Sequence, residues 1–74
     1  MEFICVLSVS GSLASYHVKS EDENRYTAML RTNNGKRDDI PAEIFLEKKN
    51  DNWESRPSHS EIVPAIIHAI ETNR

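Results

Sequence analysis

The clearest hydrophobic pattern lies in the last part of the sequence. The large aliphatic residues there are Ile62, Val63, Ile66, Ile67 and Ile70. At about 100° per residue they fall within an arc of about 140°, which predicts one amphipathic helix over residues 60–73. Pro64 restricts where this helix can begin, because a proline deep inside a helix removes a backbone hydrogen bond. We therefore expect Ser60 to cap the helix, with Ser58 and its capping-box partner Glu61 as the alternative.

Before this helix the sequence alternates between apolar and polar positions, as half-buried strands do. The expected strands are residues 3–9, 13–19, 25–31 and 42–48, with 53–55 as an optional fifth. Their connections are too short to hold crossover helices, so consecutive strands should pair antiparallel. The predicted fold class is α+β. It consists of an antiparallel β-meander of four strands, or five, with one C-terminal amphipathic helix packed on one face.

Turn-forming residues separate the predicted strands. Gly11-Ser12 lies where a two-residue hairpin turn is expected between the first two strands. The longest predicted loop is 32–41, because it contains an Asn-Gly pair that favours positive φ and ends at Pro41, which cannot join a strand ladder.

The strand predicted at residues 3–9 is apolar on both of its faces, with Phe3 on one and Ile4 on the other. The pattern does not decide which of these faces meets the helix, so Phe3 belongs either to the core or to the opposite surface. Met29 and Phe45 point away from the core residues of their own strands. Since one helix covers one face of a sheet, the remaining apolar surface predicts an interface made by Phe45, Met29 and Phe3.

Composition narrows the classes of partner. Seventy-four residues make a single domain over 1–74, and 38% hydrophobic with 28% charged residues is typical of a soluble globular domain. The net charge of −3 weighs against nucleic acid and against an anionic membrane surface, both of which attract basic proteins. Arg31, Lys36 and Arg37 could form a basic patch, but two aspartates follow at once and no aromatic residue lies among them. We expect neither a nucleic-acid partner nor a membrane partner.

The residue types that carry chemistry are sparse. The single cysteine, Cys5, lies within an apolar run, which predicts a buried and reduced thiol and hence a cytoplasmic protein. His17, His59 and His68 lack the spacing of metal ligands. No nucleophile lies beside a base, and two glycines cannot build a phosphate-binding loop. We expect no metal, no cofactor and no catalytic residues.

Two hypotheses about function follow, from different classes. The first is a small cytoplasmic protein-interaction module without catalytic activity, which self-associates as a homodimer or binds a protein partner through the open face of its sheet. The alternative is a small-ligand or metal-binding protein that uses the same face together with the loop 32–41. A third hypothesis is a minimal enzyme. It is disfavoured because the sequence offers no set of acid, base and nucleophile.

Overall fold

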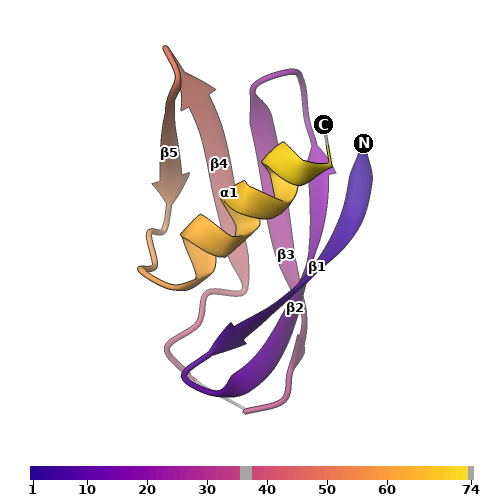
Figure 1. Cartoon of the computed structure of the whole chain (residues 1–74), viewed down its shortest axis with the longest axis vertical. Helices are drawn as coiled ribbons and strands as arrows, with labels where there is room; N and C mark the ends of the chain where they lie inside the picture. Colours follow the sequence, from indigo (N-terminus) through magenta and orange to yellow (C-terminus); the bar gives the residue numbers. More distant parts are fainter. Residues whose placement is uncertain (36–37, 74) are drawn as a thin grey trace.

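The computed structural model describes residues 1–35 and 38–73, and it shows a five-stranded antiparallel sheet with one helix across one face (Figure 1). The elements are β1 (Glu2–Val9), β2 (Ser12–Ser20), β3 (Arg25–Asn33), β4 (Glu43–Lys49), β5 (Asn52–Arg56) and α1 (Ile62–Thr72). The strand order β1-β2-β3-β4-β5 follows the chain. The predicted α+β meander with a C-terminal helix is therefore confirmed, and the optional fifth strand is present.

Two tight turns set the register of the outer hairpins. In the first, the central residues are Ser10 and Gly11, both with positive φ, so the turn lies one residue earlier than predicted. Positive φ at both central positions gives the twist that antiparallel strands require. Asn50 and Asp51 repeat this geometry between β4 and β5.

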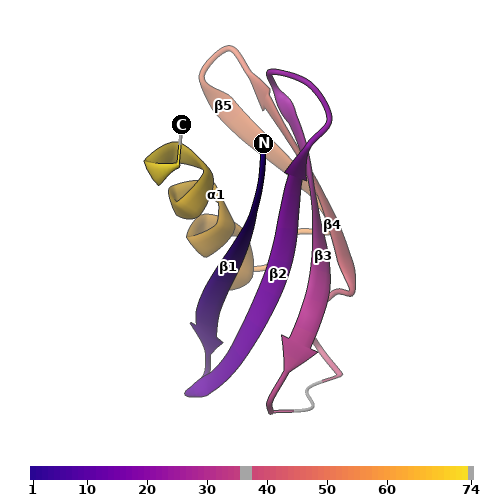
Figure 2. The same ribbon diagram turned by 90° about the vertical axis from the view of Figure 1, so that its right-hand side faces the viewer.

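The helix covers one face of the sheet, and its nearest strand is β1 (Figure 2). The buried side chains of the sheet on this side are Cys5, Leu7, Val9, Ala14, Tyr16, Val18, Tyr26, Ala28, Ile44 and Leu46. They form one cluster with four residues of α1, Ile62, Val63, Ile66 and Ile70. The even-numbered residues of β1 point to the other face. Phe3 therefore lies on the helix side, half-buried against the core, and is not part of the open face.

The start of the helix differs from both predicted caps. Helix α1 begins at Ile62, and Glu61 in the N-cap position makes no side-chain capping bond. The imidazole of His59 takes this role, because its Nδ1 accepts the backbone N–H groups of Glu61 and Ile62 at 3.1 and 3.2 Å. Pro64 is the third residue of α1, and the residue before it, Val63, already donates a helical i→i−4 hydrogen bond to the carbonyl of His59 at 3.2 Å.

The side chain of Glu61 binds the first hairpin instead. Its two carboxylate oxygens accept the backbone N–H and the hydroxyl of Ser10, at 3.1 and 3.4 Å. This contact joins the beginning of α1 to the turn between β1 and β2. The helix thus lies on one face of the sheet, and the opposite face has no covering element in the described part of the chain.

Candidate functional site: the open face of the sheet

The open face, opposite α1, carries a group of large apolar side chains. These residues, which we call the apolar band, are Ile4, Val6, Leu13, Met29 and Phe45. Each is between 50% and 66% exposed. Apart from Met1, they are all the exposed large hydrophobic residues in the part of the chain that the structure describes. Exposed apolar side chains that share one face, rather than being scattered singly, are typical of an interaction surface.

Strand pairing places the band diagonally across four strands. Ile4 of β1 lies opposite His17 of β2, which lies opposite Met29 of β3. Phe45 of β4 is paired with Thr27 of β3. Thr27 and Met29 are successive residues on the same side of β3. Directly opposite side chains in an antiparallel pair lie about 5 Å apart, so these residues form a continuous strip.

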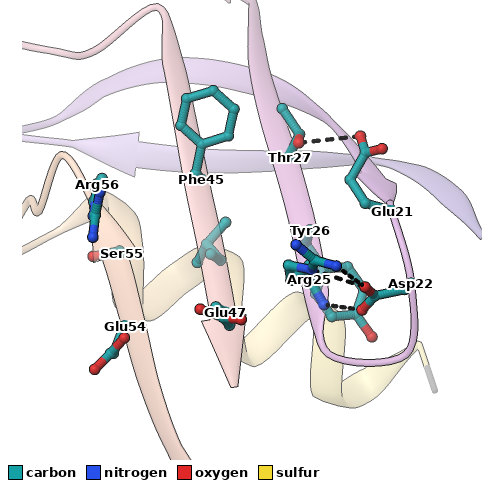
Figure 3. Close-up of a pocket in the computed structure, with 11 residues that line it drawn as sticks. Glu21, Asp22, Arg25, Tyr26, Thr27, Phe45, Glu47, Glu54, Ser55 and Arg56 are labelled. Carbon is teal, nitrogen blue, oxygen red and sulfur yellow. Dashed lines mark hydrogen bonds and ion pairs between the residues drawn. The ribbon is translucent and has the colours of Figure 1, made fainter. Parts of the chain in front are cut away.

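A shallow groove in two adjoining parts lies at the end of the band that carries Met29 and Phe45. Its larger part, about 700 Å³, lies at the end formed by β3, β4 and β5, and Figure 3 shows Phe45 in it between Thr27 and Arg56. A smaller part, about 430 Å³, extends toward β1 and includes His17 and Met29. Phe45 and Thr27 line both parts, so the two parts adjoin at these residues, while Ile4, Val6 and Leu13 line neither.

The charged side chains at the larger end are largely paired with one another. Asp22 accepts hydrogen bonds from the backbone N–H groups of Asn24 and Arg25 and a 2.8 Å contact from each of two guanidinium nitrogens of Arg25. The Asn24 N–H first, and then Arg25, hold the pKa of Asp22 below its usual value. Lys49 lies 3.5 Å from Glu47 and 3.7 Å from Glu54, which are themselves opposite each other on β4 and β5. Phe45 is the exposed large apolar side chain among these charged residues.

The structure separates the residues that the sequence offered for chemistry. Cys5 is buried, and this burial raises the pKa of its thiol, which favours the neutral form over the nucleophilic thiolate. His59 caps the helix, and His68 is exposed on it, so only His17 lies on the open face. Among residues 1–35 and 38–73, no three His, Cys, Asp or Glu side chains are placed to hold a metal ion.

Other candidates from the sequence lie away from the groove. Lys36 and Arg37 are outside the described residues, and no described residue of the loop 32–41 lines the groove. Ile40 of that loop is buried, and Pro41 accepts a 2.7 Å hydrogen bond from the hydroxyl of Tyr16. Ile40 and Pro41 therefore contact the core side of the sheet, while Asn34, Gly35, Asp38 and Asp39 are exposed.

Sequence reasoning missed three members of the apolar band. The sequence does not assign Ile4, Val6 and Leu13 to the open face, because β1 is apolar on both sides and Leu13 precedes the alternation of β2 that begins at Ala14. Leu13 lies four residues before His17, so both side chains lie on the same side of β2, and this spacing could have placed Leu13 on the open face. Met29 and Phe45 are exposed on the open face as the alternation indicated.

Comparisons of the chain with protein-family models, with curated proteins and with solved structures find no match. None of the helices described here is long and apolar enough to cross a membrane.

Proposed function

We propose that this protein is a small cytoplasmic interaction module without catalytic activity that self-associates through its open sheet face. The observation that supports this most is the concentration of exposed apolar side chains in the apolar band, opposite the single helix. Covering them would remove apolar area from water, at a gain of about 25 cal/mol per Å². A second copy brings an identical band, and a two-fold axis lets each band cover the other. The reduced, buried thiol of Cys5 supports the cytoplasmic location.

Phe45 is the best probe of this face. Its side chain is 52% exposed, while Ile44 and Leu46 on either side of it are buried. We expect Phe45→Lys to stay folded, because the new ammonium group remains in water, and to lose self-association, because the same group would be buried in the interface. Light scattering across the micromolar range measures the molar mass, and far-UV circular dichroism reports the fold.

The matched control is His68→Lys, which adds the same charge on the exposed side of α1. This variant should self-associate like the parent chain. A parent chain that is monomeric at high concentration would rule out self-association. Unfolding of Phe45→Lys would instead show that Phe45 belongs to the core.

The groove supports a second candidate function, the binding of a small ligand on the open face. Its larger part has a volume of about 700 Å³, within the range of small-molecule sites. The ring of Phe45 would supply the apolar contact there, and Arg56 a charged group. A fragment screen by NMR tests this candidate: it predicts shifts at Thr27 and Phe45 at protein concentrations where the chain is monomeric.

A further inference from the structure

We infer that the groove beside Met29 and Phe45 docks a basic peptide segment of a protein partner. The inference goes beyond the proposed function, because this partner differs in chemistry from a second copy and its binding does not require self-association. The charges that surround the two exposed apolar side chains identify the partner.

Strand pairing places one carboxylate on each side of this apolar pair. Glu43 of β4 lies opposite Met29 of β3 and two residues before Phe45 on the same side of β4. Glu21 accepts a 3.2 Å hydrogen bond from the hydroxyl of Thr27, which is the cross-strand neighbour of Phe45. Figure 3 shows this row, from Phe45 through Thr27 to Glu21. Because cross-strand neighbours lie about 5 Å apart, one long side chain lying on the apolar pair can reach either carboxylate.

Neither carboxylate is neutralised by a basic side chain in the described part of the chain. Arg25 is paired with Asp22, and Lys19 is the cross-strand neighbour of Glu2 on β1. The remaining described basic residue of the groove, Arg56, lies on β5. Within residues 1–35 and 38–73, no basic side chain lies within ion-pairing distance of the two carboxylates. Their negative charge is therefore available to a partner.

A lysine or arginine side chain is complementary to this arrangement. Its aliphatic stem covers apolar surface while its charged end stays in water or beside a carboxylate. Hydrogen bonds between such a cation and a carboxylate are stronger than those between neutral groups. An acidic protein or the phosphates of a nucleic acid would instead be repelled, so charge selects a basic partner.

The shape of the groove favours an extended segment over a small amine. Its two parts, about 430 and about 700 Å³, adjoin at Thr27 and Phe45. Both parts are shallow, whereas small-molecule sites usually bury most of the surface of their ligand. A peptide that crosses from one part to the other covers Phe45 on the way and can place a basic side chain beside Glu43.

Fluorescence anisotropy with the whole chain and labelled synthetic peptides tests the inference. The probe is a peptide of about eight residues that alternates lysine and valine, which is long enough to cross the groove. The comparison peptide has glutamine in place of each lysine. We expect the lysine peptide to bind about tenfold more tightly, because only lysine can pair with the carboxylates. Equal affinities for the two peptides would overturn the inference.

Two charge reversals separate this site from the general attraction of an acidic protein for a basic peptide. Glu43→Lys and Glu71→Lys change the net charge of −3 by the same amount, but Glu71 is exposed on α1, which covers the other face of the sheet. We expect Glu43→Lys to weaken binding of the lysine peptide about fivefold or more and Glu71→Lys to weaken it much less. Far-UV circular dichroism checks that both variants are folded. Equal weakening in the two variants would overturn the docking site.

Phe45→Ser tests the apolar half of the contact without changing the charge. We expect this variant to bind the lysine peptide about threefold more weakly, because the stem of the basic side chain loses its apolar neighbour. Unchanged binding would mean that charge alone holds the peptide, which contradicts docking in the groove. Spermidine, a small amine, should compete only at much higher concentration than the unlabelled peptide. Competition at the same concentration would overturn the assignment to a peptide.

Salt distinguishes this inference from the proposed self-association. Binding of the lysine peptide should weaken about fivefold when NaCl is raised from about 0.05 M to about 0.5 M, because salt screens the attraction between opposite charges. Repulsion between two acidic copies is screened by the same salt, so self-association should respond with the opposite sign. A chain that binds the peptide yet stays monomeric would contradict self-association and support the basic partner. A chain that self-associates but does not distinguish the lysine peptide from the glutamine peptide would do the reverse.

Discussion

At the scale of single residues, His59 shows a side chain placed for structure rather than chemistry. Its imidazole Nδ1 accepts two backbone N–H groups that the start of α1 would otherwise leave without partners. We expect His59→Ala to lower the free energy of unfolding by about 1 kcal/mol, the usual cost of losing an N-terminal cap. Urea unfolding followed by circular dichroism measures this change.

His59→Asp is the informative companion, because a carboxylate can also accept these N–H groups and its charge suits a helix N-terminus. This variant should recover most of the stability lost in the alanine variant. Equal losses in both variants would mean that the capping bonds contribute nothing. Ser60→Ala should have little effect, since His59 accepts the backbone N–H groups of Glu61 and Ile62.

At the scale of elements, the helix and sheet are held together by one face of α1. Ile66 is fully buried in the shared core, while His68 is exposed. We expect Ile66→Asp to destabilise the protein by about 4 kcal/mol or more, because it buries a carboxylate with no partner. Because the free energy of unfolding of a small domain is only a few kcal/mol, this variant should be unfolded.

His68→Asp serves as the control for the same substitution on the opposite side of α1. It should change the melting temperature by no more than a few degrees, as surface substitutions usually do. Thermal melts of the two variants should differ clearly. Similar melting curves would contradict the assignment of the helix face.

At the scale of the whole molecule, net charge opposes the proposed self-association. Each copy carries a net charge of −3, so two copies repel each other at low ionic strength. We expect the dissociation constant to fall about threefold when NaCl is raised from about 0.05 M to about 0.5 M, because salt screens this repulsion while apolar contacts persist. Sedimentation equilibrium at neutral pH measures the effect. Weaker association in salt would indicate that ion pairs between the copies dominate the interface.

The sequence by itself determined the elements and their order. The stripe that includes Ile66 and Ile70 predicts α1, and the alternation around Tyr16 and Val18 predicts β2, because both patterns reflect local geometry with periods of 3.6 and 2 residues. Short connections then allow only an antiparallel meander. The same alternation predicts that Phe45 lies on the face of β4 opposite Ile44 and Leu46. This part of the candidate site therefore also follows from the local sequence pattern.

The tertiary structure decided which residues meet across the sheet. Phe3 and Ile4 are equally apolar, and only the docking of α1 on β1 makes Phe3 part of the core side and Ile4 part of the open face. The place of His17 between Ile4 and Met29 depends in the same way on contacts fixed by folding. The physical reason is that periodicity reports the two sides of each strand, whereas the choice of the covered side depends on packing between residues distant in the sequence.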